Sequence, residues 1–384
     1  MKTILFVYPT LFNPFVGGIE RVTDLLAKEL IARGYKVLYL HNKRNEALLS
    51  YKYPTKIFYF PSENYNDKIN VKYYQHFLRE HHINIVINQA GNFADSHLYL
   101  ETGTLNVKTI SVLHSLPLLN YDHLSEQELI LKKKSFFGYV KLIARLLIYV
   151  KIKGDYFKRR LNHFKFLFEH TDLVCLLSRS HFADFKALGL EHSSCKVVSI
   201  PNPCSFPINK CNKKKQILYV GRLTKSEKRP DRLLKIWNLL YKDFPDWELV
   251  IVGDGMEKVN LEKNAKKMRN VIFCGFQNPL PYYRDASIFC LVSNYEGFPM
   301  TLPEAMSCGT IPLAFDSFSA LHDIIENGVT GYIIPAFSIK KYAEKLRLLM
   351  KNENLREQIS LNAMQSVERF SLDKVTDQWE KLFI

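Results

Sequence analysis

The chain has 384 residues, of which 47% are hydrophobic and 24% are charged, with Gly and Pro at ordinary levels. This composition predicts a globular protein with large buried cores, and the length is sufficient for two domains. The seven cysteines are scattered and include no C-x-x-C pair, which indicates a reducing, cytosolic compartment and argues against a zinc site.

The apolar run at the N-terminus, MKTILFVYPTLFNPF (1–15), carries one lysine, stops at Pro9 and is followed by no small-residue cleavage site. These features favour a buried first strand over a signal peptide. No uncharged apolar stretch approaches the roughly 20 residues that a membrane-spanning helix needs. Any contact with a membrane is therefore expected at the membrane surface.

Apolar strands alternate with helices through the first half of the chain. The first strand, at 2–10, precedes a helix at 18–34 whose apolar residues recur at helical spacing and which ends at a glycine. A further helix is expected to end near Leu188. The other strands of this half are expected at 35–42, 56–61, 83–89, 109–115, 171–178 and 196–203. This alternation predicts a parallel sheet that is covered on both faces.

Much of the net charge of +15 lies in one segment, residues 131–165, with eight lysines, three arginines and the single acid Asp155. Apolar residues near helical spacing, from Phe136 to Val150, lie between the cations. Three interpretations stay open: a helix on an anionic bilayer, a helix packed on its own domain with a solvated basic face, and a nucleic-acid site, which no accompanying motif supports. The cations are Lys132, Lys133, Lys134, Lys141, Arg145, Lys151, Lys153, Lys158, Arg159, Arg160 and Lys165.

The alternation pauses at PNPCSFPINKCNKKKQ (201–216), which has no periodicity and is rich in Pro, Asn and Lys, as a linker is. Helices are then expected at about 230–242, at 302–308 and ending near Asn327. The strands of this second series are expected at 217–223, 247–255, 271–276, 287–294, 310–316 and 331–335. The whole pattern predicts an α/β protein of two doubly wound domains with a ligand site outside the carboxyl ends of the strands. The predicted divisions are a first domain at 1–203, a linker at 204–216, a second domain at 217–365 and a C-terminal helix at 366–384.

Two carboxylates, Glu296 and Glu304, lie eight residues apart in SNYEGFPMTLPEAMSCGTIPLAFD (293–316). The strand expected at 287–294 ends just before Glu296 and places it in the expected cleft. The alternative is that Glu296 is a solvated loop carboxylate. Thr301 to Glu304 has the S/T-x-x-E form of a capping box, which predicts Thr301 as a helix cap and gives Glu304 a structural explanation. The end of such a helix is also a ready anion site. We interpret the pair as two hydroxyl acceptors that flank a phosphate site.

The motif around these carboxylates, S-x-Y-E-G-F-P-x-x-x-x-E-A-M-x-C-G, resembles the donor-site signature of family 4 glycosyltransferases, which have the GT-B fold. Three other segments resemble parts of that family in the same order: GGIE (17–20) its Gly-rich loop, IPNP (200–203) the end of its first domain, and GRLTKSEKRPDRLL (221–234) its G-R-L...K segment. The resemblance spans nearly the whole chain. It implies two Rossmann-like domains that face a central cleft.

The resemblance implies roles for the residues that match the second domain of the family. Arg222 and Lys228 would grip the donor diphosphate, Glu304 would bind the ribose hydroxyls, and Glu296 would bind the hydroxyls of the donor sugar. Without the flanking motif, the two cations would be interpreted as surface residues. The remaining donor-site candidates are Gly297 and Phe298 beside Glu296, and Gln277 in FCGFQNPLPYY (273–283), the expected base-reading loop.

Three candidates come from the first domain. Gly17 and Gly18 would let the chain approach the phosphate or the acceptor closely. His114, at the end of the strand at 109–115, matches a histidine that lines the reacting centre, where it would stabilise developing charge or orient the acceptor. A structural histidine is the alternative.

The resemblance also implies a retaining, front-face transfer in which the departing β-phosphate takes the proton of the acceptor. No metal or other cofactor is expected, and the donor is expected to be UDP-linked. The chain departs from the family at Lys228-Arg229-Pro230, where many members have Lys-Gly, and at 319–323, where many have G-P-x-E. The second departure leaves the identity of the donor sugar open.

We therefore expect a cytoplasmic, peripheral membrane glycosyltransferase. It would transfer a hexose or N-acetylhexosamine to a lipid-linked or polysaccharide acceptor in bacterial surface glycan assembly, such as capsule, O-antigen or lipopolysaccharide. The alternatives are a nucleotide-sugar epimerase of similar fold and a catalytically silent protein that binds a nucleotide sugar or anionic lipid. Nucleic acid is not an expected partner. The segment 371–383 is expected to form a helix that returns to the first domain through Trp379, or that lies on the second domain.

Overall fold

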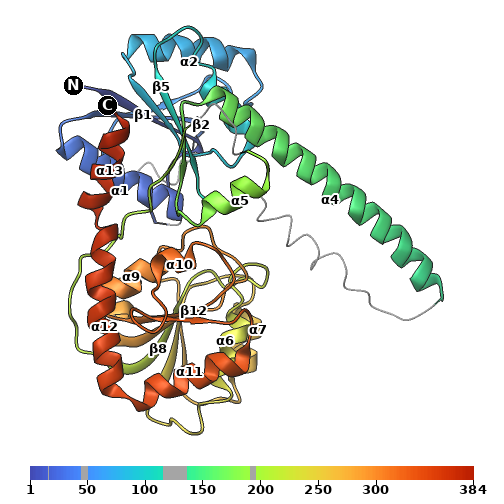
Figure 1. Ribbon diagram of the computed structural model, residues 1–384, viewed down its shortest axis with the longest axis vertical. Helices are drawn as coiled ribbons and strands as arrows, with labels where there is room; N and C mark the ends of the chain where they lie inside the picture. Colours follow the sequence, from blue (N-terminus) through green and yellow to red (C-terminus); the bar gives the residue numbers. More distant parts are fainter. Residues whose placement is uncertain (16, 45–50, 116–135, 191–195) are drawn as a thin grey trace. The chain divides into compact units, whose positions relative to one another are not determined.

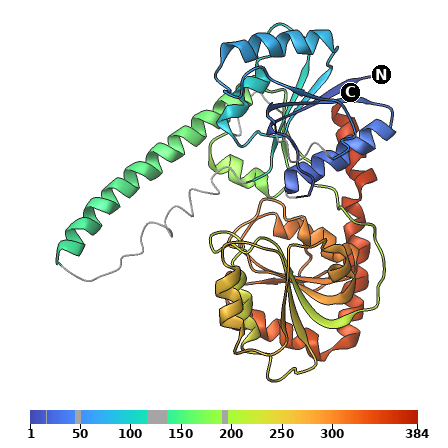
Figure 2. The same cartoon turned by 180° about the vertical axis from the view of Figure 1, so that it is seen from behind.

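A computed structural model describes the chain except for residues 16, 45–50, 116–135 and 191–195. The described residues form two compact units, one made of Met1–Leu176 and His181–Ser199, the other of Leu177–Ser180 and Ile200–Ile384. Figures 1 and 2 show each unit as a sheet with helices against it. The linker predicted at 204–216 lies within the second unit.

The described part of the first unit contains a seven-stranded parallel sheet in the order β3-β2-β1-β4-β5-β6-β7. The strands are β1 (Thr3–Thr10), β2 (Lys36–Lys43), β3 (Ile57–Tyr59), β4 (Ile85–Asn88), β5 (Lys108–Leu113), β6 (Leu173–Leu176) and β7 (Lys196–Ser199). Every residue of β4 and β6 is buried, as expected for strands that are covered on both faces. The strand order reverses beside β1, so the sheet is doubly wound.

The helices of the first unit are α1 (Gly18–Ala32), α2 (Lys68–Glu80), the short 3-10 helix η2 (Ala94–Leu100), α4 (Phe136–His170) and α5 (His181–Ala187). Helix α1 ends before Gly34, whose φ of +91° suits glycine. The Asp67 side chain caps α2 by accepting a hydrogen bond from the Ile69 N–H at 3.1 Å. Helix α2 was not predicted from the sequence.

Helix α4 covers most of the basic segment; residues 131–135 of that segment, with Lys132, Lys133 and Lys134, lie outside the described residues. Its C-terminal part packs on the first unit (Figure 1) through Phe164, Leu167 and Phe168, which are at most 1% exposed. Among the described helices, none combines the length and the apolar character needed to cross a membrane.

The second unit contains, in its described residues, a six-stranded parallel sheet in the order β10-β9-β8-β11-β12-β13. The strands are β8 (Lys214–Val220), β9 (Glu248–Val252), β10 (Val271–Gly275), β11 (Ala286–Leu291), β12 (Ile311–Phe315) and β13 (Tyr332–Ile334). Strand β8 begins inside the predicted linker because Lys214 pairs with Ala286 of β11. The two doubly wound sheets confirm the predicted fold class.

Helices surround the sheet of the second unit, and Trp237 and Trp247 lie in its core, each 1% exposed. The predicted helix at 230–242 is shorter, because the chain turns through i to i+3 bonds such as that from Leu240 N–H to the Trp237 carbonyl. The helices are α6 (Pro230–Trp237), α7 (Lys258–Ala265), α8 (Leu280–Asp285), α9 (Thr301–Ser307), α10 (Leu321–Ile324), α11 (Ile339–Lys351), α12 (Glu353–Val367), η3 (Glu368–Phe370) and α13 (Leu372–Leu382). Helix α13 confirms the helix predicted at 371–383. Its return to the first domain stays a prediction.

His41 and His163 of the first unit are buried in their neutral form. His41 in β2 is 0% exposed and its Nδ1 lies 3.1 Å from the Tyr8 carbonyl oxygen. Burial lowers the pKa of His41 to about 4, and burial is also the main reason why the pKa of His163 in α4 falls to about 4. Both rings are therefore uncharged at pH 7.

Acid is expected to destabilise the first unit before its carboxylates titrate. Because the folded pKa of each histidine lies below the unfolded value of about 6.5, the unfolded chain binds protons that the folded chain does not. The free energy of unfolding should fall as the pH drops from about 6.5 toward 4, by up to about 3 kcal/mol per histidine. Urea unfolding as a function of pH measures this change. His41→Phe should reduce the pH dependence, whereas the exposed control His76→Phe should not; equal slopes for wild type and His41→Phe would contradict the prediction.

Candidate active site

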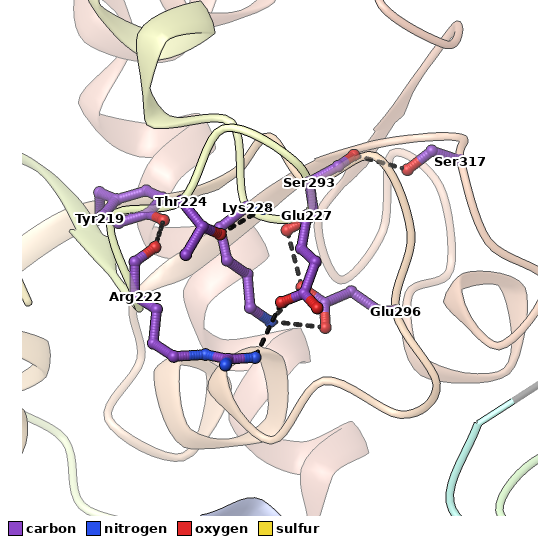
Figure 3. Close-up of polar contacts among 8 residues, drawn as sticks. All are labelled: Tyr219, Arg222, Thr224, Glu227, Lys228, Ser293, Glu296 and Ser317. Carbon is purple, nitrogen blue, oxygen red and sulfur yellow. Dashed lines mark hydrogen bonds and ion pairs between the residues drawn. The ribbon is translucent and has the colours of Figure 1, made fainter. Parts of the chain in front are cut away.

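The candidate site of the second unit lies where two neighbouring strands end. Strands β8 and β11 pair in parallel, so their carboxyl ends lie at the same edge of the sheet. Arg222 and Lys228 follow β8, and Glu296 follows β11. Figure 3 shows that the three side chains meet there. The structure thus brings together three of the predicted site residues.

Lys228 and Glu296 form a largely buried ion pair. The Lys228 Nζ lies 2.7 and 2.8 Å from the two Glu296 carboxylate oxygens, and the Ser293 hydroxyl donates to Oε1 at 2.7 Å. Glu296 is 8% exposed, which excludes the solvated loop carboxylate that the sequence left open. The Ser317 hydroxyl donates to the Ser293 carbonyl and holds this segment against the loop after β12 (Figure 3). Water would solvate either charge poorly at this depth. Each charged group therefore needs the other as its partner, which holds the ion pair in one geometry.

Arg222 pairs with a residue that the sequence analysis missed. Its Nη2 lies 2.8 Å from a carboxylate oxygen of Glu227, and the Arg222 side chain is 68% exposed. The backbone of Glu227 also matters, because its carbonyl accepts a hydrogen bond from the Asn294 N–H at 2.7 Å. Burial, with Glu227 as the next cause, raises the pKa of Tyr295 to about 12. Glu227 therefore joins the loop after β8 to the loop after β11. A carboxylate directly before Lys228 was the available signal.

The predicted capping box at Thr301 is wrong. Helix α9 has Met300 at its N-cap position with no side-chain cap, so Thr301 is already the first helical residue. The Glu304 carboxylate instead accepts hydrogen bonds from the Ser205 hydroxyl at 3.1 Å and the Tyr283 hydroxyl at 3.3 Å. Glu304 is 1% exposed, so its carboxyl group depends on these protein partners for hydrogen bonds that water would otherwise make.

Glycines let the loops after β8 and β9 approach each other. Gly253 has φ of +142°, and a Cβ there would lie 1.9 Å from the Gly221 carbonyl oxygen. A Cβ at Gly255, φ +155°, would lie 2.6 Å from the Leu223 carbonyl oxygen. Both positions therefore require glycine. The GDG sequence at 253–255 was the signal, and the sequence analysis assigned no role to it.

Three other predicted site residues, Gly297, Phe298 and Gln277, belong to the second unit. Gly297 is half-buried, and Phe298 is 6% exposed with its ring edge-on to Phe370 at a centroid distance of 5.6 Å. Gln277 is exposed just after β10. Its proposed contact with the base stays a prediction.

Three predicted residues belong to the first unit. Gly17 is the N-cap residue of α1 with an extended backbone, and a Cβ there would lie 1.6 Å from the Glu20 carboxylate; Gly18 is exposed. His114 follows β5, and its Nε2 lies 2.6 Å from the Gln89 Oε1. Burial lowers the pKa of His114 to about 3, so the ring is neutral at pH 7. Since a carbonyl oxygen only accepts, Nε2 carries the proton.

No group of three or more His, Cys, Asp or Glu side chains that could hold a metal ion occurs among the described residues.

Two family models together match nearly the whole chain. Residues 16–205 match "Glycosyltransferase Family 4", and residues 205–366 match "Glycosyl transferases group 1". The chain belongs to the family 4 glycosyltransferases. The resemblance seen in the sequence is confirmed.

Curated relatives of this glycosyltransferase family align over part of their length. An uncharacterized glycosyltransferase of Haemophilus influenzae is 36% identical over 191 residues, which are 48% of this chain and 54% of the relative. The amylovoran biosynthesis glycosyltransferase AmsD of Erwinia amylovora is 32% identical over 174 residues, 44% of this chain and 48% of the relative. The chain thus spans about half the length of the curated relatives it matches.

Solved structures of glycosyltransferases share the whole fold. Anabaena HepE in complex with UDP superposes with a TM-score of 0.73 at 17% identity, covering 100% of this chain and 99% of that protein. The apo form of the lipopolysaccharide outer core galactosyltransferase WaaB has a TM-score of 0.69 at 20% identity, covering 99% and 98%. These likenesses show the GT-B fold.

Removal of Lys228 alone is expected to destabilise the second unit, because Glu296 would stay buried with its charge unpaired. Lys228→Met should lower the free energy of unfolding by about 2 to 4 kcal/mol, and adding Glu296→Gln should recover most of the loss. Urea unfolding followed by tryptophan fluorescence measures both. Arg222→Met is the control, since its exposed pair should contribute at most about 1 kcal/mol. Equal losses for Arg222→Met and Lys228→Met would contradict the prediction.

Proposed function

We propose that the chain is a retaining, metal-independent glycosyltransferase that takes a hexose or N-acetylhexosamine from a UDP-linked donor. The observation that carries the proposal is the meeting of Arg222, Lys228 and Glu296 at the paired ends of β8 and β11. The strand order of the second sheet reverses between β8 and β11. In doubly wound sheets, nucleotides bind at such a reversal. The UDP complex of HepE, a protein of the same fold, supports the choice of base.

The two cations would exchange partners when the donor binds. Lys228 and Arg222 now pair with Glu296 and Glu227. A diphosphate carries more negative charge than either carboxylate and offers a guanidinium two acceptors at once. Glu296, released from Lys228, would then accept hydrogen bonds from adjacent hydroxyls of the donor sugar.

Catalysis would rest on stabilisation of the leaving group. The positive charges of Arg222 and Lys228 would lower the energy of the departing diphosphate, and the β-phosphate would accept the acceptor's proton on the same face of the sugar. Glu304 would accept hydrogen bonds from the ribose hydroxyls, in place of those that it accepts from the Ser205 and Tyr283 hydroxyls. The neutral imidazole of His114 would orient the acceptor or stabilise the charge that develops on the sugar.

The acceptor is proposed to be a lipid-linked or polysaccharide glycan of the bacterial surface. A Campylobacter jejuni relative, 28% identical over 195 residues, is named as an N-acetyl-D-galactosaminyltransferase that acts on a glycan linked to undecaprenol through PP. An Escherichia coli relative, 32% identical over 171 residues, is named for O-antigen biosynthesis. These names support an acceptor of this class for the present chain.

The nucleotide is tested by melting the protein with UDP, GDP and ADP. A ligand that binds only the folded state at about 100 times its Kd adds about 2.7 kcal/mol, which should raise the Tm by about 5 °C or more. We expect UDP alone to do so, and Arg222→Ala and Glu304→Ala to abolish the shift. Lys225→Ala, which removes an exposed cation from the same loop, is the matched control and should keep it. No shift with any nucleotide would overturn the proposed donor site.

The anionic membrane surface is the second partner that we propose, through residues 131–165, on the cytosolic face of the membrane. Helix α4 carries exposed cations at Lys151, Lys158, Arg159 and Lys165 in its described part. Cations beside an anionic bilayer each contribute about 1 kcal/mol to binding. The basic segment is therefore long enough and charged enough to hold the protein at a bilayer without spanning it.

Vesicles of phosphatidylglycerol and phosphatidylcholine should sediment the protein, and purely phosphatidylcholine vesicles should not. Replacement of Lys132, Lys133, Lys134 and Arg159 by Gln should release it. Arg160 is left unchanged, because it contacts Asn92 inside the first unit. The control removes four exposed lysines of the second unit, Lys263, Lys266, Lys267 and Lys340, and should leave sedimentation unchanged. Equal sedimentation of the two variants would contradict the membrane proposal.

A further inference from the structure

The loop between β4 and η2 is buried, although loops normally run over the surface. Gln89 and Asn92 are 2% and 8% exposed, and Gly91 is buried between them. Buried backbone carbonyls need hydrogen-bond partners. The partners of this loop come from two directions, namely the end of β5 and helix α4.

On one side, the loop holds the backbone and the ring of His114. The Asn92 Oδ1 accepts hydrogen bonds from the His114 N–H at 2.6 Å and the Ser115 N–H at 3.2 Å, and its Nδ2 donates to the Ser115 carbonyl at 3.0 Å. The Gln89 Oε1 accepts from the His114 Nε2. Both the main chain and the imidazole of His114 are therefore placed by the loop.

On the other side, helix α4 holds the carbonyl groups of the same loop. Arg160 Nη1 donates to the Asn92 carbonyl, and His163 Nε2 lies 2.8 Å from the Gly91 carbonyl oxygen. Since that oxygen only accepts, His163 carries its proton on Nε2, and its Nδ1 accepts from the Nε2 of His97 at 2.9 Å. This neutral tautomer is consistent with the burial of His163, which is 4% exposed.

The loop has no room to shift toward β5. A Cβ on Gly91 would lie 2.7 Å from the Val112 carbonyl oxygen and 2.8 Å from the Leu113 Cδ2. A close-packed contact of this kind transmits a displacement instead of absorbing it. A change at Arg160 should therefore move Asn92 and, with it, His114.

We propose that Arg160 and His163 of α4 are positioning residues, which set the place of His114 through the buried loop 89–92. The proposal rests on the proposed function to the extent that His114 serves glycosyl transfer. Its structural part, from α4 to the ring of His114, stands on contacts within the first unit alone. The helix that bears the basic segment thus also supports the candidate catalytic histidine.

The test compares variants of the full chain. Arg160→Ala removes the donor to the Asn92 carbonyl. If this variant does not fold, the Arg160→Gln variant is measured in its place. Arg160→Lys keeps a charged donor. The matched control is Arg79→Ala, which removes the same group from helix α2 of the first unit, where Arg79 is exposed.

Two readouts separate positioning from general damage. The first is the ¹⁵N and ¹H signal of the His114 ring in histidine-labelled protein, assigned by its loss in His114→Gln. The second is release of UDP from UDP-glucose, UDP-galactose and their N-acetylated counterparts, analysed as kcat and KM. A displaced catalytic group costs on the order of 10- to 100-fold in rate. The donor site lies in the other unit, so the KM for donor and the thermal shift with UDP should not change.

The expected result is a changed His114 signal and a kcat at least tenfold lower in Arg160→Ala, partial recovery in Arg160→Lys, and wild-type behaviour in Arg79→Ala. An unchanged His114 signal in Arg160→Ala, or the same change in Arg79→Ala, would overturn the proposal. If the wild type neither binds UDP nor releases it, the proposed function fails instead. The His114 signal then still decides whether Arg160 positions the ring.

Discussion

The parallel pairing of strands that are distant in sequence is the constraint on which the candidate site depends. Because a crossover helix separates paired parallel strands, neighbours in the sheet bring loops from far along the chain to one edge. In the second unit, β8 pairs with β11, and this pairing joins Lys228 to Glu296, 68 residues later. In the first unit, β4 pairs with β5, and this pairing places Asn92 beside His114. Both groups of candidate residues thus arise from one topological rule applied twice.

Charge pairing within the site follows from that placement. Lys228 and Arg222 each have a carboxylate partner, but the two ion pairs differ in how far they are buried. The pair of Lys228 and Glu296 is largely buried and is costly to separate, whereas the pair of Arg222 and Glu227 is exposed and contributes little to stability. In the proposed donor site, a diphosphate would therefore recruit Arg222 at small cost. To recruit Lys228, the diphosphate would have to replace Glu296 as the partner of the lysine, which would favour ligands with a concentrated negative charge.

The described part of helix α4 has one side in the protein core and another side in solvent. Its described C-terminal part has an apolar side, with Phe164, Leu167 and Phe168 in the core, and exposed cations at Lys158 and Lys165. Between these sides lie Arg160 and His163, whose polar groups meet the carbonyls of the loop 89–92. A net-charge count treats Arg160 as one more surface cation. Its half-buried position over the Phe164 ring and its bond to Asn92 show that it belongs to the interior of the first unit.

The sequence by itself determined the class of fold and the identity of most candidate residues, because these depend on local patterns. Apolar runs flanked by turn residues located the thirteen strands found among the described residues, and the motif around Glu296 singled out the residues after β11. The tertiary structure alone decided what each polar side chain contacts. Glu304 appeared to complete a cap, but its partners Ser205 and Tyr283 lie 99 and 21 residues away, where no local pattern could indicate them. Asn92 and His163 escaped notice for the same reason: a hydrogen bond between remote segments exists only after the strands have paired and brought them together.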